Sequence, residues 1–274
     1  MPGFASYDAV LDALTVAGKG EDYYFNKAAI TTVATTFWSL WTAAGQPGVG
    51  TFGGTPLAAR VVNSSTTGAL GFTNPVGPDT KHVLAFNAAS SVAAGTLLLV
   101  DHLLDYPGIS ATSTSLQTMD NTATLSRYTT GAGVQMFAEV TTALGATPQT
   151  CTVIYVDQGG AAGTTSFSPV VSSAVPRIPQ VGFFIPLAAG DTGVRSITSV
   201  QFGGSMAAGV LNFTLCRPFV DLPIQVAAIA VERNLILHTP RVTQIVDNAA
   251  LMFLLNAATT SSGNIVGSLR AAAR

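Results

Sequence analysis

Short apolar runs alternate with turn residues from Lys81 to the C-terminus, and this spacing most constrains the fold. In the run "GVLNFTLC", Leu211, Phe213 and Leu215 fall on one face and polar residues on the other. Successive side chains of a strand point to opposite faces, so this period-two pattern indicates half-buried strands. Many such runs separated by turns predict an all-β fold, an antiparallel β-sandwich of jelly-roll type, over residues 80–274.

The first 79 residues have a different texture. The stretch "YDAVLDAL" has helical spacing, and residues 26–45 favour helix slightly over strand. Residues 46–79 are rich in Gly, Pro, Ser and Thr, which is typical of a loop or an extended arm. We therefore expect residues 1–79 to form a partly helical segment and an extended arm that contacts partners.

Two further elements are expected near the C-terminus. The run "LPIQVAAIAVERNLIL", residues 222–237, is compatible with a short helix, and residues 249–271 predict a closing hairpin around the turn "TTSSG". Its first strand, "ALMFLL", is apolar on both faces. Such a strand is central, covered on both sides, or placed at a subunit interface.

Charged residues make up 9% of the chain, against roughly 25% in ordinary soluble domains. Either solubility matters little where the protein works, or other subunits cover much of its surface. The formal net charge of −2 gives no basic surface, which argues against a nucleic-acid partner. The uncharged stretches 28–59 and 248–269 are both interrupted by polar or turn residues, so neither predicts a membrane span.

The tripeptide Asp191-Thr192-Gly193 matches the signature around the catalytic aspartate of aspartic proteases. Such an aspartate shares one proton with a second carboxylate, but the chain has no second copy of the signature. Val194 also stands where those proteases have Ser or Ala. We interpret the segment as a turn between two strands, in which Asp191 accepts backbone hydrogen bonds, and expect any further role at a subunit contact together with Arg195.

Asp101, His102 and Asp105 lie together in "LLLVDHLLDYPG" and are the other candidates for chemistry. Asp101 and His102 are neighbours, so in a strand they point to opposite faces. Nothing in the spacing connects them with His82 or His238. We expect polar residues at a strand end, or a buried aspartate that caps a turn, rather than a metal or catalytic site.

A serine, two cysteines and a long connection are the other features that bear on function. Ser205, in "FGGSMAAG", lacks the flanking pattern of a nucleophile elbow. Cys151 and Cys216 lie in separate strand-like runs, which favours two buried free thiols over a disulfide or a metal site. The long connection 105–130 is of the kind used for functional or subunit-contact loops. The sequence thus predicts no catalytic residue, no cofactor and no metal, and we expect no enzymatic activity.

Several blocks together resemble a group of tailed-bacteriophage virion proteins, in which similar blocks recur in the same order. The most specific is "PLAAGDTGVRSITSV". The full set consists of residues 23–50, 97–110, 152–165, 184–202 and 209–219.

The resemblance implies a structural component of the virion, assembled in the host bacterial cytoplasm. A capsid decoration (cement) protein, which stabilises the head shell through non-covalent contacts, fits this implication best. Its partners would be the major capsid protein and further copies of itself, for example in a trimer. A tail or neck structural protein is an alternative, as is an adhesion module that binds a host glycan through residues 105–130.

Overall fold

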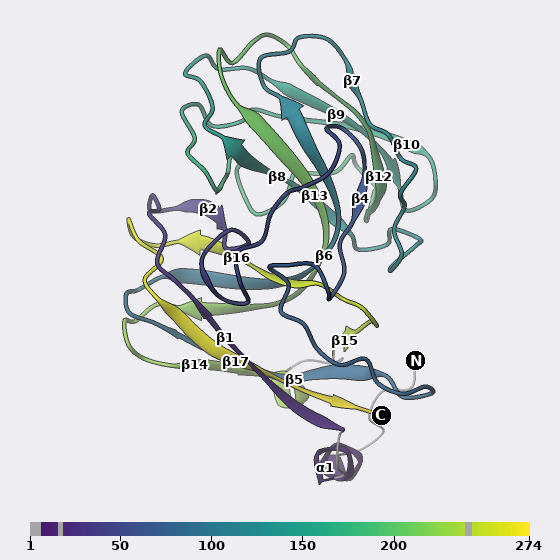
Figure 1. Cartoon of the computed structure of the whole chain (residues 1–274), viewed down its shortest axis with the longest axis vertical. Coiled ribbons are helices and arrows are strands. Elements are labelled where there is room, and N and C mark those ends of the chain that lie inside the picture. The colour runs from purple at the N-terminus through teal and green to yellow at the C-terminus, as the bar shows by residue number, and fades with distance from the viewer. Residues whose placement is uncertain (1–6, 16–18, 239–242) are drawn as a thin grey trace.

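The structure is a computed structural model that describes residues 7–15, 19–238 and 243–274. Its regular structure is almost entirely β, in three antiparallel sheets that form two stacked lobes (Figure 1). This confirms the predicted all-β, sandwich-like fold. Neither of the two helices in the described part of the chain is long and apolar enough to cross a membrane.

The elements in chain order are α1 (Tyr7–Thr15), β1 (Gly20–Lys27), β2 (Thr36–Ser39), β3 (Gly45–Gln46), β4 (Arg60–Val61), β5 (Lys81–Ser90), β6 (Gly95–Ser110), β7 (Gln117–Thr118), β8 (Gln135–Thr142), β9 (Cys151–Asp157), β10 (Ala162–Phe167), β11 (Arg177–Ile178), β12 (Val194–Phe202), β13 (Val210–Ile224), β14 (Val231–Asn234), α2 (Leu235–His238), β15 (Gln244–Ile245), β16 (Leu251–Ala257) and β17 (Ile265–Ala273).

One long sheet, in the order β11-β2-β16-β6-β13-β8, contributes to both lobes. In the lower lobe it packs against the sheet β14-β5-β17-β1-β3, around an aromatic core in which the Phe25 and Phe253 rings lie 4.4 Å apart. In the upper lobe it packs against the sheet β10-β9-β12-β7, around a second core that includes Tyr106, Tyr155 and Phe213. Each lobe is therefore a sandwich with its own core.

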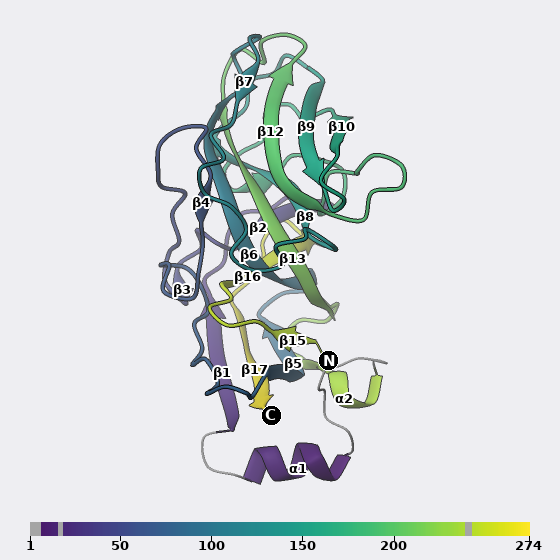
Figure 2. The ribbon, with the colours of Figure 1, turned by 90° about the vertical axis from the view of Figure 1, so that its right-hand side faces the viewer.

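The strands β6 and β13 run from one lobe into the other (Figure 2). Their antiparallel ladder skips Leu103, because Leu104 pairs with Leu215 and His102 pairs with Cys216. This bulge brings His102 and Asp105 to the same side of β6, although a separation of three residues would otherwise place them on opposite faces.

Strands β1 and β3, which precede residue 47, belong to a sheet of the lower lobe. Helix α1 confirms the helix predicted from "YDAVLDAL". The slight preference for helix over residues 26–45 is wrong, because this run contains β2 and no helix among its residues, all of which the structure describes. Trp38 pairs with Leu255 of β16, and Trp38 and Leu40 join buried cores; this packing decides the conformation of a Thr- and aromatic-rich segment.

Residues 47–79 run mostly without regular structure, as predicted for the extended arm, and β4 is the exception. Backbone hydrogen bonds from Leu57 to Pro107 and from Val62 to Leu103 hold this arm alongside β6.

The predicted closing hairpin over residues 249–271 is wrong. Strand β16 lies in the long sheet between β2 and β6, whereas β17 lies between β5 and β1 in the other sheet of the lower lobe. Strand β16 is central and almost wholly buried, as its two apolar faces predicted. The helix considered for residues 222–237 is reduced to α2, since the preceding residues complete β13 and form β14.

Candidate functional site

The most unusual side-chain arrangement is a buried polar cluster where β6 passes from the lower to the upper lobe. We call it the junction cluster; it is built on β4, β6, β8, β13 and the segment before β8. Six of its side chains have no exposed surface: Asp101, His102, Asp105, Glu139, Asn212 and Thr214. Two arginines, Arg60 and Arg127, enter it from segments that are distant in sequence.

Asp101 and Arg127 form the first part of the junction cluster. The Arg127 guanidinium donates to both carboxylate oxygens of Asp101, at 2.8 and 3.0 Å, and also to the carbonyl oxygens of Val62 and His102. The Ala250 amide donates to Asp101 at 2.8 Å. Burial raises the pKa of Asp101, and the hydrogen bonds from Arg127 and Ala250 oppose that rise. The Arg127 side chain thus connects the segment before β8 to β6 and to the arm.

Asp105 is the centre of the second part. His102 Nε2 lies 2.6 Å from its Oδ1, Arg60 donates to its Oδ2, and Asn212 and Thr214 each lie 3.2 Å from Oδ1. Burial alone would raise the pKa of Asp105, but His102 and Arg60 outweigh it and hold the pKa below its usual value. The carboxylate therefore ties β6 to β13 and to the arm.

Glu139 on β8 is the third part and is poorly satisfied. Within the described residues, neither of its carboxylate oxygens has a hydrogen-bond partner. Burial raises its pKa well above the usual range, and the charge on Asp105 adds to the rise. The nearby Ser39 hydroxyl opposes the rise, although it does not reach hydrogen-bond geometry with either oxygen. Ser39 Oγ accepts the Trp41 amide at 3.1 Å. Glu139 faces Asn212 across the β8–β13 ladder, and its raised pKa favours the uncharged acid.

The His102–Asp105 pair has the geometry of half a catalytic triad, but its position decides against that role. The imidazole is fully buried and its ring packs edge-on against Trp41, with centroids 4.7 Å apart. A substrate cannot reach it without opening the core. Among the described residues, no group of three His, Cys, Asp or Glu side chains could hold a metal ion. The junction cluster is thus a polar cross-link between the lobes.

The sequence singled out Asp101, His102 and Asp105, and the structure brings all three into this cluster. Asp101 and Asp105 are both fully buried, as one alternative predicted. A turn-capping role and a position at a strand end are both wrong, because all three residues lie inside β6. Sequence reasoning missed Arg60, Arg127 and Glu139. The lone glutamate inside the apolar run "VQMFAEVTTAL" was the available signal, since an unpaired charge on a buried strand is rare.

Asp191 is half-buried in a turn that precedes β12, and Gly190 has φ 94° there. The Tyr155 hydroxyl donates to Asp191 and accepts the Ala188 amide at 2.7 Å. Burial and the Asp191 carboxylate raise the pKa of Tyr155 to about 12. Arg195 donates to the carbonyl oxygens of residues 130 and 158. Asp191 thus helps fix a turn, but through the Tyr155 hydroxyl and not through the backbone donors that the sequence predicted, since the amides of residues 192 and 193 donate to Gln158.

The predicted strand on each side of this turn is only half correct. Strand β12 follows it, whereas residues 181–190, all of which the structure describes, form no strand. Their backbone is held by other contacts: the Ile185 amide donates to Met136, and the Phe183 ring packs against Phe37 at 4.9 Å.

The remaining candidates are dispersed. Cys151 and Cys216 are free and buried, which confirms the predicted thiols. Ser205 is exposed, and its hydroxyl accepts the amide of residue 207. His82 lies in the lower lobe with its Nε2 2.9 Å from Thr80 Oγ1. The side chain of His238 lies outside the described part of the chain.

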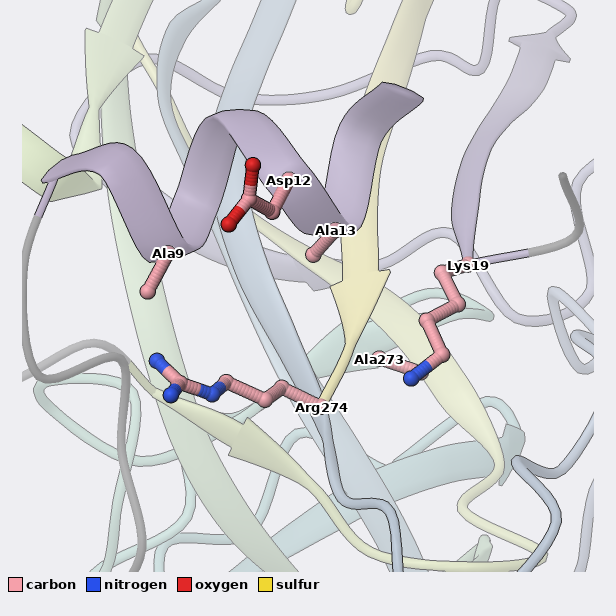
Figure 3. Close-up of a pocket in the computed structure, with 6 residues that line it drawn as sticks. All are labelled: Ala9, Asp12, Ala13, Lys19, Ala273 and Arg274. Atoms are coloured by element: carbon pink, nitrogen blue, oxygen red, sulfur yellow. The ribbon is translucent and has the colours of Figure 1, made fainter. Parts of the chain in front are cut away.

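The connection expected over residues 105–130 starts later, because residues 105–110 complete β6. The rest of it is anchored rather than free. Its β7 joins the upper sheet beside β12, Tyr106 donates to Asn121, and Arg127 returns to the junction cluster. A pocket that does open to solvent lies between α1 and the last residues of the chain (Figure 3). There Lys19 is already paired with Asp79 at 3.1 Å.

Comparisons with known proteins add little. No family model matches the chain, and no curated protein matches it. Among solved structures, the chain is similar to one described as "Structure of infectious bursal disease virus Gt strain", with 10% identity over 93% of this chain and 81% of that chain. The TM-score is 0.16, so this similarity carries no argument about fold or function.

Proposed function

We propose that this chain is a structural protein of a tailed-bacteriophage virion, and that it decorates and stabilises the head shell through non-covalent contacts. The observation that carries the proposal is the set of sequence blocks that resemble such virion proteins, above all residues 186–200. The His102–Asp105 pair supports a structural role, because it has the geometry of half a catalytic triad and yet both side chains are fully buried.

Residues 186–200 belong to the scaffold of the upper lobe. They contain the Asp191 turn and most of β12, the strand between β9 and β7. Val194, Ile197 and Val200 of this block are fully buried in the upper core. Residues 186–200 thus stabilise the fold of the upper lobe, which is consistent with a block shared among structural proteins.

The surface also supports a role in assembly. Large apolar side chains are exposed, including Val76 and Val181, both at 86%, and Tyr24 at 71%. Charges that would keep such a surface from associating are scarce, at 9% of the residues. A surface with so few charges has little electrostatic protection against association, which fits a protein that works among many neighbours.

Particles made without this protein are expected to release their genome at a lower temperature and under milder osmotic shock than complete particles. The reason is that a protein bound to the assembled shell, and not to its separated subunits, stabilises the shell by mass action. The measurement is dye-detected genome release during heating, for particles with, without and with re-added purified protein.

Re-added protein is expected to bind and to restore resistance, whereas an unrelated protein of similar size is the control and restores none. Equal resistance with and without the protein would rule out the stabilising role. Failure of the purified protein to bind the particles at all would count against the virion assignment itself.

A further inference from the structure

Four loops at one end of the lower lobe contain no charged residue and no histidine. They have eight, four, six and seven residues, 25 in all: residues 28–35, 91–94, 225–230 and 258–264. We call this surface the uncharged end. In Figure 1 it lies at the left of the lower lobe, where β5, β13 and β16 end and β6, β14 and β17 begin.

The four loops form one continuous surface, because backbone hydrogen bonds join each of them to a neighbour. The loop 28–35 is joined to the loop 258–264, which is joined in turn to the loop 91–94. The loop 225–230 is joined to the end of β5 beside the loop 91–94. The bonded pairs are Thr32–Thr260, Ser91–Asn264, Ala258–Ala94 and Ala228–Ser90.

The loop 225–230, "QVAAIA", is the most apolar part of this end, and all six of its residues are exposed. Val226 is 53% and Ile229 56% exposed, and Val33 on the loop 28–35 is 50% exposed. Ala228 has φ 58°, a conformation that costs free energy in a residue other than glycine. Its amide is nevertheless bonded to Ser90 at 2.7 Å, so the loop has a defined shape.

We propose that the uncharged end is the surface through which copies of this chain bind one another. Around a rotation axis, residues near the axis face their own copies, so any charge there would meet a like charge. A surface without charges avoids this repulsion. Four of its 25 residues are buried (Thr32, Ala94, Ser262 and Gly263). The other 21 match the roughly 20–30 residues that each partner contributes to a stable interface.

A membrane fits this surface less well than a second copy. Loops and helices that bind anionic lipid surround their apolar residues with Lys and Arg, and the uncharged end has neither. The inference deepens the proposed function, since the resemblance implies copies of the chain as partners. Its test uses the purified protein alone, so it can fail while binding to the particle stands.

The test is sedimentation of the purified full-length chain over a range of concentrations, for wild type, Ile229→Lys and Leu116→Lys. Leu116, in the connection before β7 of the upper lobe, is exposed to nearly the same extent as Ile229 and serves as the matched control. Wild type and Leu116→Lys are expected to associate equally. Ile229→Lys is expected to associate about tenfold more weakly or not at all, because three lysines would gather at the axis of a trimer, and two at that of a dimer.

Hydrogen exchange of wild type provides a second readout that needs no variant. Amides of the loop 225–230 are expected to gain protection as the protein concentration rises. The proposal is overturned if wild type stays monomeric, if Ile229→Lys associates as wild type does, or if Leu116→Lys weakens association equally. Flotation of monomeric wild type with phosphatidylcholine vesicles would assign the surface to lipid and overturn it as well.

Discussion

Replacing Arg127 with Met is expected to lower the free energy of unfolding by about 3–5 kcal/mol, which is what removing one partner of a buried ion pair costs. Arg127 is 4% exposed and Asp101 is fully buried. Without the guanidinium, Asp101 keeps the Ala250 amide and either takes up a proton or remains a buried charge. The carbonyl oxygens of Val62 and His102 also lose their donor. The measurement is urea denaturation at neutral pH.

The exposed pair of Arg233 and Asp221 provides the control. Its side chains are 38% and 49% exposed, so Arg233→Met is expected to cost less than about 1 kcal/mol. Adding Asp101→Asn to Arg127→Met is expected to recover part of the loss, because position 101 then no longer holds an unpaired buried carboxylate. Similar losses for Arg127→Met and Arg233→Met would contradict the role assigned to the junction cluster.

Replacing Glu139 with Gln is expected to remove a loss of stability that wild type shows as the pH rises. The folded-state pKa of Glu139 is raised, so between its unfolded value near 4.5 and the raised folded value only the folded chain holds the proton. Its contribution to stability is complete below the unfolded pKa and is lost as the pH rises through the folded pKa. The loss is about 1 kcal/mol or slightly more for each pH unit in that window.

The measurement is the free energy of unfolding from pH 5 to pH 9 for wild type and Glu139→Gln. The difference between the two is expected to grow in favour of the variant as the pH rises. Glu232, which is exposed on β14, gives the matched control, and Glu232→Gln is expected to follow wild type. Parallel profiles for wild type and Glu139→Gln would show that Glu139 is not held uncharged.

The spacing of apolar residues predicts those elements whose conformation depends mainly on their own sequence. Strand β13 follows from the alternation around Phe213, and α1 follows from the spacing of its apolar residues. The prediction for residues 26–45 is wrong, because the local preferences for helix and strand differ little there. Pairing of β2 with β16 determines the conformation. The predicted hairpin of β16 and β17 failed for a related reason: a turn-rich segment between two strands does not say whether they share a sheet.

The sequence identifies three residues of the candidate site, but not the contacts between them. In a chain with few charges, Asp101, His102 and Asp105 stood out as a group. The bulge at Leu103, which joins His102 to Asp105, has no signal in the sequence. Arg127 lies 26 positions from its partner, and such a contact follows only from the tertiary fold.

Imaging of the purified virion, at a resolution that allows chains to be traced, would locate the protein in the particle. We expect the two-lobed protein on the outer surface of the head, with neighbouring copies in contact through the uncharged end. Density for the protein in the neck or tail would contradict the decoration role. Its absence from the purified particle would contradict the assignment as a virion structural protein.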